Sequence, residues 1–220
     1  MEGKETEKMI PEWHSPPWIV KKIFSDFIWE SRTDKVLITI DDGPNAELTD
    51  RLLKFFTEQN LKTIMFFVGD EMMKNPNLVR EVISAGHTIG CHSMGHNKLT
   101  KLSYPQVNEE ISNFNLQCEN EFGIHVKFFR PPYGRFNSNV TKAAKSNVLK
   151  TVMWSLLTFD YKNDFDIVKF AIVKYLKSNS IVVFHDNQKS KEIVIDSLKY
   201  LLDRAAKHGF RIGEPSECLK

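Results

Sequence analysis

Two histidines four residues apart, His92 and His96, are candidate ligands for one metal ion. Imidazoles at this spacing can reach a shared ion from one helical turn or from a bend that follows a strand. A carboxylate from another strand would complete a set of two histidines and one aspartate, which leaves one coordination position open for water. That open position is typical of catalytic metal sites. The spacing alone also fits a pair of unrelated surface histidines.

Asp41 and Asp42 follow the apolar run Lys35–Ile40 and could supply that carboxylate. Charge at the end of a buried strand is costly unless it is paired or functional. Adjacent side chains on an extended chain point in different directions, so one aspartate can bind the ion while the other faces water or substrate. The alternative is that these acids interact favourably with the N-terminus of the helix expected to begin at Ala46. That would account for one aspartate, but not for two.

His185 follows the apolar run 181–184 and could act as a general acid, because imidazole titrates near neutral pH. Asp160 or Asp186 could hold and tune it. The alternative is a buried histidine whose ring binds a backbone carbonyl. Arg130 could pair with a buried carboxylate such as Asp41 and keep that acid ionised, or it could form a surface ion pair.

These residues follow β-branched and aromatic runs that alternate with amphipathic stretches, as in a parallel sheet covered by helices. The carboxyl ends of parallel strands share one edge, where we expect the polar side chains to meet. No glycine-rich loop follows a strand, since Gly43 and Gly69 are isolated, so a small or incomplete barrel is favoured over a doubly wound sheet. Strands are expected at 35–40, 62–68, 87–91, 126–129, 148–154, 180–184 and 209–212, and helices at 46–58, 77–85, 105–122, 137–146, 165–177 and 191–207.

The chain has 220 residues, 30 basic and 28 acidic, which gives a net charge of +2 and removes the electrostatic argument for a dedicated nucleic-acid binder. Three cysteines do not make a disulfide framework. No run is long and apolar enough for a transmembrane segment, and without an apolar leader after Lys8 the expected location is the cytoplasm. Residues 13–29 combine aromatics with two lysines, so they form either a membrane-surface helix or, as we favour, a segment that caps the domain.

Five ordered motifs resemble the polysaccharide deacetylase family, the NodB-homology group of carbohydrate esterases. They are Thr39–Pro44, His92–His96, Arg130–Gly134, Trp154–Tyr161 and Ile181–Asp186. The resemblance covers about residues 35–212. It implies a distorted (β/α) barrel of about seven strands in the α/β class. We expect residues 35–220 to form this deacetylase domain and residues 1–34 to form an N-terminal extension that packs on the barrel.

The resemblance also implies roles for individual residues. Asp42, His92 and His96 look like the ligands of one divalent metal, with zinc the first choice and cobalt, manganese or nickel as alternatives. Asp41 looks like the base that activates water, and Arg130 looks like its partner. His185 looks like the acid that protonates the leaving amine, tuned by Asp160. The residues implied to contact substrate are Pro131, Tyr133 through its backbone N–H, Trp154 and Val183.

The implied activity is removal of N-acetyl groups from the amino sugars of an N-acetylglucosamine-containing glycan, with release of acetate. The sequence departs from the common family pattern at Ile40, Leu157 and Tyr161, which replace Phe, Asp and Trp. Hydrolysis of an O-acetyl ester or another small amide would use the same machinery. A barrel that only binds sugar is a further alternative, although it would need neither Asp41 nor His185.

Overall fold

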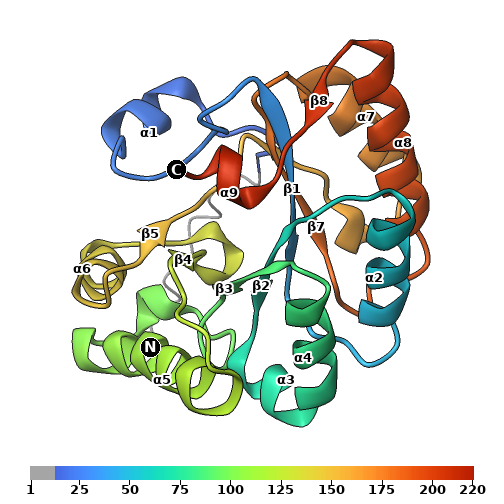
Figure 1. The fold of residues 1–220 in the computed structure, drawn as a ribbon. Helices are drawn as coiled ribbons and strands as arrows, with labels where there is room; N and C mark the ends of the chain where they lie inside the picture. Colours follow the sequence, from blue (N-terminus) through green and yellow to red (C-terminus); the bar gives the residue numbers. More distant parts are fainter. Residues whose placement is uncertain (1–12) are drawn as a thin grey trace, which may run out of the picture.

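Parallel strands build a single curled sheet around which the helices are arranged, and the computed structural model describes residues 13–220 (Figure 1). Seven strands follow the spatial order β5-β4-β3-β2-β1-β7-β6, and β8 pairs with β1 outside this order. Every ladder is parallel, so the predicted barrel class is confirmed. The strands are β1 (Lys35–Asp41), β2 (Ile64–Phe67), β3 (Thr88–Cys91), β4 (Phe128–Phe129), β5 (Lys150–Thr151), β6 (Leu156–Leu157), β7 (Ile181–His185) and β8 (Arg211–Ile212).

Helices cover the outside of this sheet, with α2, α7 and α8 beside β1 and β7, and α5 and α6 on the side of β4 and β5 (Figure 1). Within residues 13–220, no helix combines the length and the apolar character that a bilayer crossing requires. The helices are α1 (Trp18–Ile23), α2 (Thr49–Glu58), α3 (Gly69–Lys74), α4 (Pro76–Ser84), α5 (Tyr104–Phe122), α6 (Ser138–Ser146), α7 (Phe165–Tyr175), α8 (Val194–Lys207) and α9 (Pro215–Cys218).

Strand β1 is buried on both faces and divides the core into two parts. Val36, Ile38 and Ile40 pack outward against the helices, whereas Leu37 joins an inner cluster with Ile64, Phe66, Val152 and Ile181. This alternation follows from the two-residue period of a strand. The same period brings Thr39 and Asp41 to the inner face. Along this face, the side chains of β1 therefore change from apolar at Leu37 to polar at the carboxyl end of the strand.

The segment 28–31 runs between the edge strand β5 and the start of β7. Ile28 donates from its backbone N–H to Thr151 O at 2.9 Å and accepts from Met153 N–H at 2.8 Å. Ser31 N–H donates to Asn179 O at 2.9 Å, beside a bridge that joins Glu30 and Ser180. The chain that precedes β1 therefore pairs with backbone groups beside β5, at one edge of the sheet, and with backbone groups just before β7. Residues 1–12, the first part of the expected extension, lie outside the described residues.

Candidate active site

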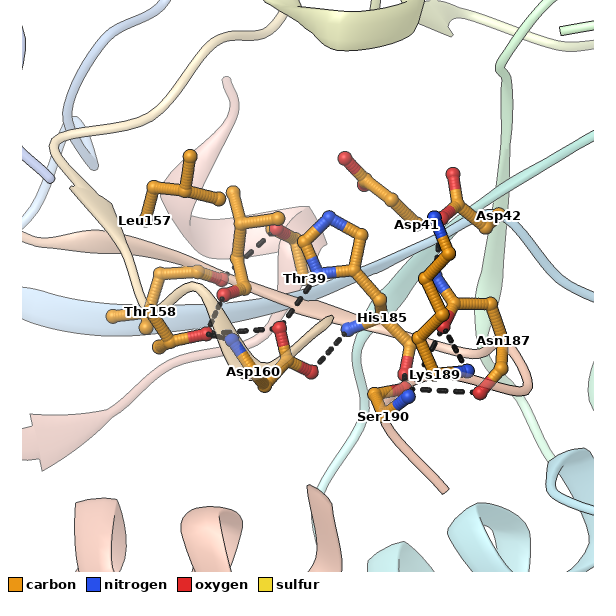
Figure 2. Close-up of polar contacts among 12 residues, drawn as sticks. Thr39, Asp41, Asp42, Leu157, Thr158, Asp160, His185, Asn187, Lys189 and Ser190 are labelled. Carbon is orange, nitrogen blue, oxygen red and sulfur yellow. Dashed lines mark hydrogen bonds and ion pairs between the residues drawn. The ribbon is translucent and has the colours of Figure 1, made fainter. Parts of the chain in front are cut away.

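Polar side chains from four strand ends meet at the carboxyl edge of the sheet. Asp41 ends β1, His92 follows β3, Arg130 follows β4 and His185 ends β7. Figure 2 shows the His185 ring between Asp160 on one side and the Asp41–Asp42 pair on the other. The convergence expected from parallel strands is therefore present in the structure.

Asp42, His92 and His96 bring three potential metal ligands together. Asp42 Oδ1 lies 3.1 Å from His96 Nε2 and 3.5 Å from His92 Nε2, and the three ligand atoms lie within 4.8 Å of one another. Burial alone would raise the pKa of Asp42, but hydrogen bonds from the two histidines hold it well below its ordinary value. Two imidazole nitrogens and one ionised carboxylate form the donor set of a catalytic zinc site.

His92 and Asp42 are each oriented by a second hydrogen bond. His92 Nδ1 donates to the Arg130 carbonyl oxygen at 2.7 Å, which fixes the ring with Nε2 on the side of Asp42. Asn187 Nδ2 donates to Asp42 Oδ2 at 2.6 Å (Figure 2), so Oδ1 is the oxygen that faces the histidines. Such outer hydrogen bonds fix the tautomer and direction of metal ligands. The residues present therefore fit a divalent cation.

Arg130 lies inside the barrel with no exposed surface and fixes Asp41. Its Nη1 donates to Asp41 Oδ1 at 2.6 Å and to Thr39 Oγ1 at 2.7 Å. Its Nε and Nη2 donate to the carbonyl oxygens of Val152 and Met153 at 3.0 and 2.9 Å. Burial lowers the pKa of Arg130 against the opposing effect of the Asp41 charge, and a guanidinium remains a cation regardless. Asp41 is therefore held by a buried cation that donates four hydrogen bonds in all.

His185 is bound by Asp160 and not by Asp186, which resolves the two possibilities left open by the sequence. Asp160 Oδ1 accepts from His185 Nδ1 at 2.7 Å. Burial would lower the pKa of His185, but the charge and hydrogen bond of Asp160 outweigh it and raise this pKa to about 9. Asp186 instead accepts from Thr49 Oγ1 at 2.6 Å, and burial raises the pKa of Asp186 to about 7. At neutral pH, His185 therefore carries a proton that it can donate.

The residues expected to contact substrate lie beside this site. Tyr133 is 55% exposed, and its ring centroid lies 4.7 Å from that of His96. Trp154 packs against the cluster that contains Val183. Pro131 is buried, and its carbonyl oxygen accepts from Gly134 N–H at 3.0 Å, which shapes the turn that carries Tyr133. An exposed aromatic ring and an apolar cluster thus lie beside the acids and histidines.

The sequence reasoning missed Asn187, Thr158 and the contact of Thr39 with Arg130. Thr158 Oγ1 lies 3.1 Å from Asp160 Oδ1 and 2.7 Å from the Val183 carbonyl oxygen. Thr39 lies two residues before Asp41 on the same strand, so the period of two could have placed it on the inner face. Asn187 lies two residues after His185 at a strand end, but its contact with Asp42 has no signal in the local sequence.

Comparisons with known proteins agree with this geometry. The family model described as polysaccharide deacetylase matches residues 30–152. A peptidoglycan-N-acetylglucosamine deacetylase from Bacillus cereus is 32% identical over 200 residues, covering 87% of this chain and 92% of the relative. A crystal structure of a peptidoglycan N-acetylglucosamine deacetylase has a TM-score of 0.84 at 25% identity, covering 93% of this chain and 98% of the other. A family 4 carbohydrate esterase from Streptomyces lividans in complex with acetate has a TM-score of 0.73 at 28% identity, covering 81% and 91%.

Proposed function

We propose, from the premise that this chain belongs to the polysaccharide deacetylase family, that it is a metal-dependent hydrolase that removes N-acetyl groups from amino sugars and releases acetate. Its substrate would be a glycan that contains N-acetylglucosamine, as the names of its relatives suggest. The proposal is carried by the relative positions of the candidate metal ligands and the two oriented side chains beside them. The Asp42, His92 and His96 cluster lies beside an aspartate held by Arg130 and a histidine held by Asp160.

Asp42, His92 and His96 would hold one divalent cation, zinc in the first instance, with cobalt, manganese and nickel as alternatives. Such a cation polarises an amide carbonyl and lowers the pKa of a nearby water to about 7. The chain fixes the direction of two of the three ligands, since Asn187 holds Asp42 and the Arg130 carbonyl oxygen holds His92. A preformed ligand set spares the cost of ordering these side chains when the ion binds.

Asp41 would be the base that takes the proton from the attacking water. Arg130 Nη1 occupies its Oδ1 at 2.6 Å, so the other oxygen is left for the water. Because the guanidinium is fixed by Thr39, Val152 and Met153, it holds the carboxylate in one orientation. A base held in one orientation saves part of the entropy that the reaction would otherwise cost.

His185 would be the acid that protonates the departing nitrogen. Amide hydrolysis needs this proton because an amine anion is a poor leaving group. Asp160 binds Nδ1, so Nε2 is the atom that donates. Base and acid therefore lie in opposite electrostatic surroundings, because an arginine cation contacts Asp41 and an aspartate contacts His185.

The acetyl group would be bound by the remaining expected residues. The Tyr133 backbone N–H would donate to the oxygen that becomes negative in the transition state, a contribution of about 3–4 kcal/mol for a well-placed donor. Trp154 and Val183 would surround the methyl group. Pro131 would act through the turn that orients Tyr133.

Acetate release from short N-acetylglucosamine oligomers, measured after loading the metal-free protein with each cation in turn, tests the proposal. We expect activity that chelation abolishes and a divalent cation restores. Asp42→Ala and His92→Ala should be inactive, whereas His125→Ala, whose side chain is 79% exposed, should retain full activity. Full metal-dependent activity in the first two variants would exclude this site. A parallel panel of acetyl esters, with sugar binding measured in the absence of turnover, covers the ester-hydrolase and binding-only alternatives.

A further inference from the structure

The loop Ser93–Asn97, called here the histidine loop, brings His96 to Asp42 with a backbone that needs support. Ser93 and His96 have φ values of +65° and +53°, a region that residues with a Cβ rarely occupy. Within the loop, Ser93 Oγ accepts from His96 N–H at 3.0 Å. Left-handed conformations at two non-glycine residues persist when surrounding contacts enforce them.

One carboxylate from outside the five motifs binds the histidine loop at three points. Glu110 Oε2 accepts from the backbone N–H groups of Met94 and Gly95, both at 3.0 Å. Its Oε1 accepts from Asn97 Nδ2 at 2.7 Å. Hydrogen bonds that involve an ionised acceptor are shorter and stronger than those between neutral groups. Glu110 therefore binds the stretch of backbone directly before His96.

The opposite side of the histidine loop is bound by the first turn of α3. Gly69 and Asp70 donate from their backbone N–H groups to the carbonyl oxygens of Ser93 and Met94, at 3.0 and 2.9 Å. A Cβ at Gly69 would lie 2.4 Å from the Met94 sulfur, so this contact is tight. The loop is therefore held between backbone N–H groups of α3 and the carboxylate of Glu110, and the Tyr133 hydroxyl donates to the His96 carbonyl oxygen at 3.4 Å.

Glu110 is itself well anchored, and His96 depends on it more than the other ligands do. Helix α5, which carries Glu110, buries Val107, Ile111, Phe114 and Cys118 against the core. His92 follows β3 directly, and its backbone N–H donates to Phe67 O at 2.9 Å. Loss of Glu110 would therefore loosen one ligand of three and leave the barrel in place.

We infer that Glu110 is a positioning residue for the metal site, acting on His96 through the backbone of the histidine loop. The inference rests on the proposed metal-dependent function and assigns Glu110 a role outside the motifs that carry that function. Its side chain does not touch the reacting atoms. What it contributes is a loop conformation in which His96 Nε2 faces Asp42 Oδ1 at 3.1 Å.

Zinc affinity, measured by competition with a chromophoric chelator, tests this inference without relying on turnover. We expect Glu110→Ala to bind zinc about 10- to 100-fold more weakly, the usual effect of losing an outer hydrogen bond to a metal ligand. Glu110→Gln keeps an oxygen that can accept from both N–H groups but loses the charge and the acceptor for Asn97 Nδ2, so its affinity should lie between those of the wild type and Glu110→Ala. Glu110→Asp keeps the charge but is one methylene shorter, so it should bind more weakly than Glu110→Gln. Glu109→Ala, an exposed neighbour on the same helix, is the matched control.

Thermal unfolding of the metal-free variants separates positioning from a purely structural role, which would lower the unfolding temperature and leave zinc affinity unchanged. Wild-type affinity in a folded Glu110→Ala variant overturns the inference, and so does a loss in Glu110→Gln equal to that in Glu110→Ala. If Glu110→Ala does not fold, the order of Glu110→Asp and Glu110→Gln decides. A wild-type protein that binds no zinc or other divalent cation overturns the proposed metal site and this inference together. Unchanged variants of a zinc-binding protein overturn the inference alone.

Discussion

Asp160 binds His185 through both carboxylate oxygens. Oδ1 accepts from the imidazole Nδ1 at 2.7 Å, and Oδ2 accepts from the backbone N–H of the same residue at 2.8 Å (Figure 2). The pair is buried, so the charge of Asp160 is weakly screened and acts strongly on the ring. Asp160 thus fixes the direction of the imidazole and makes the largest contribution to its raised pKa, to which the charges of Asp42 and Asp41 add.

Replacing Asp160 by Asn should move the alkaline limit of activity to lower pH. The charge of Asp160 is the largest effect that raises the pKa of His185, which is about 9 with the aspartate present. Without that charge, His185 loses its proton at lower pH and with it the ability to act as an acid. The pH profile of kcat/KM measures the shift, with the exposed Asp203→Asn as control. A bound cation lowers the limit in both proteins, so the comparison is made with the same metal. Superimposable profiles would refute the assignment.

The stability of the metal-free protein should fall as the pH rises from about 6.5 to about 9. The pKa of His185 is raised above its ordinary value of 6.5, so the folded state binds this proton more tightly than the unfolded chain does. The resulting stabilisation is complete below pH 6.5 and is lost as the pH rises through the folded-state value. Urea unfolding across this range measures it. Asp160→Asn should show a weaker dependence, and an equally steep one would contradict the role of this pair.

Arg130→Met should cost about 3–5 kcal/mol of stability, the usual penalty for removing one partner of a buried ion pair. The substitution leaves Asp41 buried and uncompensated, and it frees the carbonyl oxygens of Val152 and Met153. Urea denaturation gives the loss, with the exposed Arg51→Met as control. The double variant with Asp41→Asn should recover part of the loss. A loss no larger than that of the control would show that the pair contributes little.

Gly134→Ala and Gly123→Ala form a matched pair that separates backbone strain from crowding near Trp154. Their φ values are +62° and +66°, so an added Cβ costs each about 1–2 kcal/mol. At Gly123 no atom lies within 4 Å of that Cβ, whereas at Gly134 it would lie 2.1 Å from the Trp154 ring. We therefore expect unchanged kinetics for Gly123→Ala and a raised KM for Gly134→Ala. Equal KM values would mean that Trp154 does not contact the substrate.

Asn187→Ser should weaken metal binding about 10-fold or more, because Asp42 loses the donor that fixes its Oδ2. Serine can still accept from the N–H groups of Lys189 and Ser190, as Asn187 Oδ1 does, so the turn itself should persist. Isothermal titration of the metal-free protein measures the affinity. Lys189→Ala, an exposed change in the same turn, should bind metal as the wild type does.

The long central strands could be predicted from the sequence with their bounds, whereas β5 and β8 were located but predicted too long, and β6 was missed. Runs of β-branched residues placed β1 and β7 to within one residue. The run 148–154 predicted one strand, but only Lys150–Thr151 is regular, and the separate strand Leu156–Leu157 follows. Beyond Thr151 the chain pairs with Ile28, more than a hundred residues earlier, which periodicity cannot reveal.

Helix starts and short helices were the other weak point. Helix α2 begins at Thr49 and not at Ala46, because Asn45 Oδ1 accepts from the N–H groups of Glu47 and Leu48 and forms a turn first. Helices of six residues or fewer, such as α3 and α9, contain too few turns for an apolar face to show.

The meeting of the two aspartates and three histidines could be predicted, because they follow strands whose carboxyl ends share one edge of a parallel sheet. The same pattern could not choose between Asp160 and Asp186 as the partner of His185, since both follow strands. The tertiary structure makes the choice, since it places Asp160 against His185 and Asp186 against Thr49. The contacts of Glu110 and Asn187 could not be predicted from the sequence. Each side chain binds a residue that is distant in sequence and that only the tertiary structure brings near, Met94 for Glu110 and Asp42 for Asn187.

The short stretch 28–31 has a consequence for any shortened version of this protein. A chain cut to begin at Lys35 would keep every residue of the five motifs, yet it would lose the backbone that pairs with Thr151, Met153 and Asn179. Unpaired strand edges recruit other copies of the same chain. Such a fragment would retain all the residues of the proposed active site and yet be prone to aggregate in solution. The residues before β1 should therefore be included when the protein is expressed.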